Sequence, residues 1–178
     1  MITKFAGGAS FALLFSLLHS TPVFSQGNPK LTDPEIASVA VVANQNDIGY
    51  AEVAAKRSKN PEILKFAQTM SSDHKAVIGQ AVALVKKLNV TPKDNAVSQK
   101  LLSDAAKEKK VLESTADKSF DKTYIDNEVA YHKAVISAVE GLLIPQAQNA
   151  ELKDLLTKVV PTLKAHLAHA QMVQSSIK

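Results

Sequence analysis

Residues 60–88 read NPEILKFAQTMSSDHKAVIGQAVALVKKL, and this stretch decides the fold class. Its opening Asn-Pro-Glu is typical of a helix start, because Asn caps free backbone N–H groups and proline suits the first helical turn. Apolar residues then recur at positions three and four apart, which is the period of an amphipathic helix. The stretch therefore predicts one long helix over Pro61–Leu88.

Similar apolar periodicity recurs along the chain, between short connections rich in Pro, Asn, Asp and Ser. We find no clear alternation of apolar and polar residues of the kind that a half-buried strand would show. Long helices joined by short connections favour antiparallel neighbours, so we expect an all-α, up-and-down bundle. The third helix is the most charged and should pack beside a core of the other four. The expected helices cover Pro34–Ser58, Pro61–Leu88, Val97–Asp117, Phe120–Leu143 and Asn149–Ser175.

Two local signals define the expected fourth helix. Ser119 is a residue type that caps helix starts, so we expect it to precede the first turn. Ile144-Pro145 lies at the other end, where proline should prevent the helix from continuing.

The first 25 residues have the features of a secretory signal peptide. Lys4 supplies a positive charge, and the apolar segment Phe11–Leu18 is too short for a permanent membrane anchor. We expect cleavage after Ser25, which would leave residues 26–178 as a single domain, exported most simply to a bacterial periplasm. No later stretch is apolar enough to predict a transmembrane helix.

Composition restricts the possible chemistry. The sequence has no Cys, which excludes disulfides and thiolate metal sites, so any metal would need His, Asp or Glu ligands. The net charge of +4 is spread along the chain, and we interpret Lys107–Lys110 as a solvated helix face. Nucleic-acid binding is therefore not supported. The sequence identifies neither a protein partner nor an oligomeric state.

Four histidines follow the signal peptide, and all lie on apolar faces of the expected helices. Around His74, the positions three, four and seven residues away are apolar except for Ser71. His132 and His166 have similar surroundings, and His169 follows His166 by one turn. In the first expected helix, Asp47 occupies an equally apolar face, where an unpaired carboxylate would need a cation or hydrogen-bond donors.

These residues suggest a site inside the bundle. Facing helices can supply metal ligands to a bundle core, and neutral imidazole with carboxylate suits Zn²⁺, Mn²⁺ or Fe. We interpret Asp47, His74, His132 and His166 as candidate ligands of one divalent ion; no other cofactor is indicated. Candidates for an extra ligand or an outer contact are Asp73, Glu128 and His169. The alternative is a hydrogen-bonded network that fixes helix register and binds no metal.

Three segments also carry a family resemblance. The sequence resembles the bacterial domain-of-unknown-function family numbered 4142, whose members are often labelled predicted outer membrane proteins. The resemblance implies a ferritin-like bundle over essentially the whole mature chain, and it implies no activity because the family's function is unassigned. In the family the position of Asp47 is usually Glu. The segments that carry the resemblance are Asn60-Pro61 through Phe66-Ala67 and Met70 to Asp73-His74, Phe120-Asp121 through Tyr124 to His132, and Pro161 through Leu163 to His166.

Ferritin-like di-iron enzymes carry Glu-x-x-His on two helices. In this chain Ser71 and Val129 stand at the positions of those glutamates, and Glu128 lies one residue further from His132. A two-iron centre is therefore not expected, whereas a single metal ion remains compatible with the sequence.

Three functions fit these features. The first is an exported, non-enzymatic bundle that sequesters, buffers or senses a divalent metal ion. The second is a structural protein of the envelope or of stress conditions, in which the interior polar residues form only hydrogen bonds. The third is a metal-dependent enzyme, which the sequence favours least because no nucleophile–base pair or substrate motif is recognisable.

Overall fold

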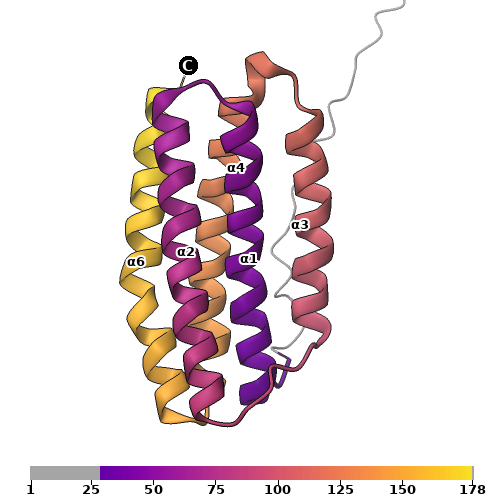
Figure 1. Cartoon of the computed structure of the whole chain (residues 1–178), viewed down its shortest axis with the longest axis vertical. Helices are drawn as coiled ribbons and strands as arrows, with labels where there is room; N and C mark the ends of the chain where they lie inside the picture. Colours follow the sequence, from indigo (N-terminus) through magenta and orange to yellow (C-terminus); the bar gives the residue numbers. More distant parts are fainter. Residues whose placement is uncertain (1–28, 178) are drawn as a thin grey trace, which may run out of the picture.

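The computed structural model describes residues 29–177, and these form an elongated helical bundle without strands (Figure 1). This confirms the predicted all-α fold. The expected signal peptide, residues 1–25, lies outside the described residues. Within residues 29–177, no helix combines the length and hydropathy needed to cross a membrane. The helices are α1 (Asp33–Arg57), α2 (Pro61–Lys87), α3 (Ala96–Ser114), α4 (Asp117–Ala138), the π-helical turn η2 (Val139–Leu143), α5 (Ile144–Gln146) and α6 (Ala150–Ser176).

The long helices pack as two antiparallel pairs with α3 outside them (Figure 1). Helices α1 and α2 form one pair, and α4 and α6 form the other. The pairs meet where α2 faces α6 and α1 faces α4. Helix α3 lies against α1 and contacts α4 only slightly, in keeping with the prediction that the most charged helix packs beside the core.

Four helices begin at polar residues that satisfy free backbone groups. The Glu35 carboxylate accepts hydrogen bonds from the backbone N–H and hydroxyl of Thr32 at the start of α1. Asn side chains accept hydrogen bonds from backbone N–H groups at the starts of α2, α3 and α6. Because these signals are local in sequence, the predicted starts of α1, α2, α3 and α6 fall within one residue of the observed ones. The three Asn caps are Asn60, Asn95 and Asn149.

The start of α4 differs from the prediction. Ser119 is not the cap, because the helix begins at Asp117. The Ser119 N–H already donates to the Ala116 carbonyl within the first turn. The Arg57 guanidinium at the end of α1 donates to the Thr115 carbonyl and to the Asp117 carboxylate. This tertiary contact holds the α3–α4 turn, and no local sequence pattern reveals it.

The end of α4 also differs. The prediction that helical structure stops before Ile144-Pro145 is wrong, because α4 continues through η2 into the short α5. Pro145 falls in the first turn of α5, where the missing backbone N–H and the fixed φ of proline are tolerated.

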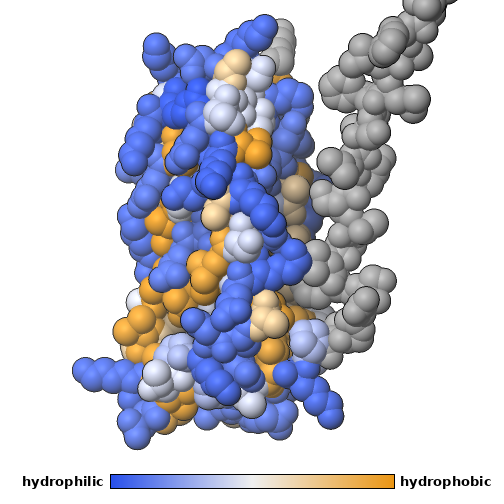
Figure 2. Space-filling model, turned by 90° about the vertical axis from the view of Figure 1, so that its right-hand side faces the viewer, coloured by the Kyte–Doolittle hydropathy of each residue, from blue (hydrophilic) through white to orange (hydrophobic). Residues whose placement is uncertain are grey.

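The bundle has two unequal halves. We call the half near the α1–α2 and α3–α4 connections the packed half, and the half near the α2–α3 connection the open half. Helix α2 contributes Ile63, Phe66, Ala67 and Met70 to the buried core of the packed half, but no residue of α2 beyond His74 is fully buried. In Figure 2, hydrophobic residues are more extensive in the lower part of the visible face, which belongs to the open half.

Candidate metal centre

The four predicted ligands come from four different helices. Asp47 lies on α1, His74 on α2, His132 on α4 and His166 on α6, and each is at most 5% exposed. Each of the first three lies near the middle of its helix, and antiparallel packing places these middles at one level. The four residues therefore lie between the two halves of the bundle.

The three histidine side chains converge, and the Asp47 carboxylate adjoins two of them. One ring nitrogen from each of His74, His132 and His166 lies within 4.8 Å of those from the other two. The Asp47 Oδ2 atom is 3.3 Å from His74 Nε2 and 3.5 Å from His132 Nε2. These separations are small enough that modest side-chain rotations would allow metal–nitrogen bonds of about 2 Å.

Hydrogen bonds on the outer side of the cluster fix the His74 tautomer. The His74 Nδ1 atom is 2.7 Å from the Asn44 side-chain oxygen, and the Asn44 amide donates in turn to the Ala40 carbonyl at 2.8 Å. Because the Asn44 oxygen can only accept, His74 Nδ1 must carry the proton. In the neutral ring, the His74 Nε2 atom then presents a lone pair to Asp47.

The other two rings are oriented in the same way. His132 Nδ1 donates to the backbone carbonyl of Glu128 at 3.0 Å, which leaves Nε2 unprotonated and facing Asp47. His166 Nε2 donates to the Asp73 carboxylate at 2.9 Å, which leaves Nδ1 unprotonated. Outer hydrogen bonds of this kind also orient histidines at known metal sites.

The result is a buried group of acceptors without a donor. The free nitrogens of His74, His132 and His166 and both Asp47 carboxylate oxygens have no hydrogen-bond partner. Buried polar atoms are normally satisfied, and an unpaired buried carboxylate costs several kcal/mol. A cation between these atoms would satisfy them.

Protonation of the rings is a poor source of that charge. Burial lowers the pKa of His132, and the nearby Asp47 carboxylate only partly opposes this effect. Burial likewise lowers the pKa of His166, against the opposing effect of its Asp73 hydrogen bond. Both rings are therefore predominantly neutral at neutral pH, the form that binds metals.

Glu128 forms a second layer behind His132. Its carboxylate is fully buried beside the Tyr124 hydroxyl, and Oε2 is 3.6 Å from His132 Nδ1. Burial raises the pKa of Glu128 well above its usual range, and the Asp47 charge raises it further. Together Asp47, Glu128 and His132 form a second group whose potential ligand atoms lie within 4.8 Å of one another.

The remaining outer candidates separate in the structure. Asp73 contacts His166, but His169 packs against Phe66 with ring centroids 5.1 Å apart and belongs to neither group of converging residues. A three-residue advance along α6 places the His169 side chain about 4.5 Å further into the packed half than that of His166. The contact between Asn44 and His74 was not predicted from the sequence. The position of Asn44, one turn before Asp47 on the same face, is the signal that could have indicated it.

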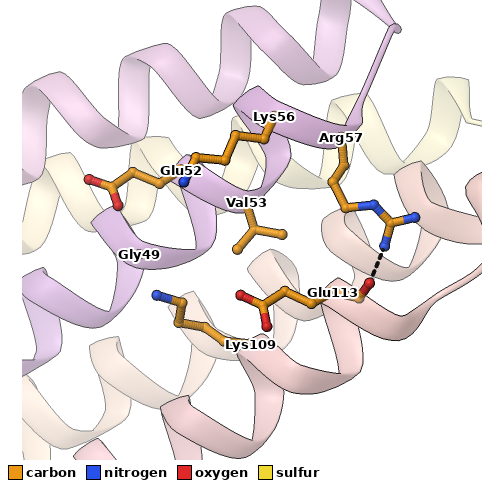
Figure 3. A pocket seen from close by; sticks show the side chains of 7 residues that line it. All are labelled: Gly49, Glu52, Val53, Lys56, Arg57, Lys109 and Glu113. Atoms are coloured by element: carbon orange, nitrogen blue, oxygen red, sulfur yellow. Dashed lines mark hydrogen bonds between the residues drawn. The ribbon is translucent and has the colours of Figure 1, made fainter.

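A surface pocket of about 240 Å³ between α1 and α3 offers less chemistry (Figure 3). Its residues carry both signs of charge, and Arg57 donates to the backbone carbonyls of Leu112 and Glu113 at the end of α3. Carbonyls at a helix end lack partners within the helix, so Arg57 has a structural role there. The interior cluster is the stronger candidate site.

Comparisons with known proteins agree with the fold. No curated protein matches the sequence. The structure titled "CopM in the Cu(II)-bound form" is similar with a TM-score of 0.62 and 16% sequence identity, covering 83% of this chain and 100% of that chain. A family model matches residues 19–173, which include every helix except the last turn of α6. The chain therefore belongs to the family described as Domain of unknown function (DUF4142).

Proposed function

We propose that this protein binds one divalent metal ion inside the bundle, through Asp47, His74, His132 and His166. The observation that carries the proposal is the group of converging acceptor atoms without a donor. A divalent cation would satisfy all of them at once. Three neutral imidazoles and one carboxylate also suit the borderline metals of the first transition row.

The surrounding residues support a preorganised site. Asn44, Asp73 and the Glu128 carbonyl hold the three rings with their free nitrogens turned inward. Such outer contacts raise metal affinity, because the ligands need not reorganise on binding. Zn²⁺, Mn²⁺ and Fe²⁺ are the first ions to test, and Cu²⁺ joins them because a protein of similar fold was solved with Cu(II).

The proposed role is to sequester, buffer or sense the ion after export. Burial of all four candidate ligands favours slow release of a bound ion. Export rests on the expected signal peptide, so the natural source of the protein for any test is a periplasmic fraction. The intact mass of that material should correspond to a chain that begins at Gln26.

Metal analysis of the untagged periplasmic protein tests the proposal. We expect one equivalent of bound metal per chain, and removal by a chelator should lower the thermal stability. At a metal concentration about a hundredfold above Kd, the bound ion should add about 2.7 kcal/mol to the free energy of unfolding. His74→Ala and His132→Ala should each abolish stoichiometric binding, measured by calorimetric titration with ZnCl₂.

His169→Ala is the matched control. It removes an imidazole one turn from His166 but outside the converging group, so metal stoichiometry should be unchanged. If His74→Ala and His132→Ala destabilise the protein equally with and without chelator, the interior residues form only a hydrogen-bonded network. That result, or a purified protein that binds none of the four metals, would overturn the proposal.

A further inference from the structure

The candidate metal site is the polar end of a much larger cavity. This cavity has a volume of about 1180 Å³, and aliphatic side chains make up most of its wall. Asp47, His74, His132 and His166 all contribute to its lining. A site for a small ion alone would not need this adjoining apolar space.

Beyond His74, α2 borders this space with side chains that its neighbours cover only in part. Its apolar stripe continues for three turns, yet every residue of the stripe remains only partly buried. Helix α1 presents small side chains to the same cavity, namely Ala37, Ala40 and Ala43. Apolar surface left partly exposed along a channel is typical of a ligand site. The stripe consists of Val77, Ile78, Ala81, Leu84 and Val85.

The shape of this part of the cavity favours an elongated ligand. Val85 lies eleven positions after His74, which corresponds to about 16 Å along a helix. An ion pair between Lys87 at the end of α2 and Glu151 in the first turn of α6 joins the two helices beyond this point. The part of the cavity that α2 and α6 line is therefore long and mainly apolar, with the candidate metal residues at its inner end and the ion pair beyond its outer end.

The residues at the inner end of the cavity determine which head group a bound ligand can carry. The Asp47 carboxylate lies closest to the rings at this end, with Oδ2 3.3 Å from His74 Nε2 and 3.5 Å from His132 Nε2. A divalent ion bound there would give a net positive centre, which attracts an anion and can accept a carboxylate oxygen as a ligand. Without the ion, Asp47 would repel the same anion.

We propose that the cavity binds a long-chain carboxylate, with its aliphatic chain along α2 and its head group at the metal ion. This inference rests on the proposed metal site. The hydrocarbon chain covers the apolar stripe of α2, and the carboxylate completes the coordination of the ion. Binding of the two ligands is therefore coupled.

Calorimetric titration of the full mature protein with dodecanoate tests the inference. The zinc-loaded protein should bind dodecanoate more than about tenfold more tightly than the chelator-treated protein, and more tightly than it binds dodecanol. Equal affinity of the zinc-loaded and chelator-treated forms for dodecanoate would overturn the coupling. Binding of dodecanol as tight as that of dodecanoate would overturn the head-group assignment.

Variants of α2 test the position of the chain. Ala81→Phe fills the channel and should weaken dodecanoate binding more than about tenfold, since it excludes methylene groups from the apolar wall. Ala83→Phe makes the same change on the exposed face of α2 and should leave binding intact. Leu84→Glu, at a partly exposed position of the channel, is a second variant that should also expel the ligand. Unchanged dodecanoate affinity in a folded Ala81→Phe or Leu84→Glu protein would overturn the inference.

A separate titration with ZnCl₂ alone distinguishes the two proposals. Ala81→Phe and Leu84→Glu should keep the zinc stoichiometry of the natural protein, because neither residue is a candidate ligand. If zinc binds and dodecanoate does not, only the carboxylate inference fails. If zinc and the other candidate metals do not bind, the proposed function fails and the carboxylate inference fails with it.

Discussion

The packed and open halves of the bundle use the same helices in different ways. In the packed half, Phe66 and Met70 of α2 and Phe120 and Tyr124 of α4 are fully buried. In the open half, α2 contributes only partly buried side chains, and the buried core is made mainly by α1, α4, η2 and α6. The contrast indicates that the packed half supplies rigidity, whereas the open half leaves space beside the candidate site.

The largest effect should come from removing a large side chain in the packed half. Phe66→Ala should lower the free energy of unfolding by about 3–5 kcal/mol, because it empties a site in contact with Tyr124 and His169. Leu84→Ala in the open half should cost about 1 kcal/mol or less, since Leu84 is already partly exposed. Chemical denaturation measures both values. Similar losses at the two positions would contradict the difference between the halves.

Loss of a polar contact should lower the free energy of unfolding more in the packed half than in the open half, though by less than loss of the Phe66 ring. Arg57 in the packed half donates to the carbonyls of Leu112, Glu113 and Thr115 and lies over the Phe120 ring. Arg57→Met should cost about 1.5–3 kcal/mol, because charge-assisted hydrogen bonds to helix-end carbonyls are lost.

Lys87→Met in the open half is the matched control for Arg57→Met. It removes an ion pair with Glu151 whose side chains are 66% and 48% exposed, and it should cost about 0–1 kcal/mol. A larger loss at Lys87 than at Arg57, measured by thermal unfolding, would reverse the assignment of the rigid end.

The smallest effect at acidic pH is expected from Glu128→Gln, at the boundary between the halves. The raised pKa means that folded Glu128 holds its proton more tightly than in the unfolded chain. Its contribution to stability is therefore fully present below the ordinary pKa of about 4.5 and is lost as the pH rises. Glutamine cannot ionise, so the metal-free variant should lose less stability than the natural protein between about pH 5 and pH 8.

Denaturation of both proteins in chelator at several pH values measures this difference. His132 and His166 act with the opposite sign, since their lowered pKa values give stability that is present above about pH 6.5 and lost as the pH falls. Both proteins contain these rings, so their effect cancels in the comparison. Parallel pH profiles would show that Glu128 is not held in its protonated form.

Local sequence determined most of the helical framework. The Asn-Pro and Asn caps placed the starts of α2, α3 and α6, because a cap acts on backbone groups within three residues. The start of α4 could not be predicted in this way, since Arg57 and Asp117 are 60 residues apart in sequence. The continuation past Pro145 was missed because the proline occupies the first turn of a new helical segment.

The candidate residues were recognisable from sequence because helical periodicity places each on an apolar face. Asp47, His74, His132 and His166 could be named from that pattern alone. Asp73 and Glu128 could be named as candidates for outer contacts, and Glu128 adjoins His132 through i,i+4 spacing on one helix. The hydrogen bond between Asp73 and His166 and the contact between His169 and Phe66 could not be assigned, because they depend on the rotation and offset of two helices.

The sequence by itself determined that the chain is helical and which faces of its helices are apolar. These properties follow from interactions over three or four residues. Only the tertiary structure decided that four acceptor groups meet without a donor and that α2 leaves a channel beside them. The physical reason is that the distance between helices depends on side chains from all the packed helices together. Small residues on α1 and the partly buried apolar stripe of α2 together leave the space.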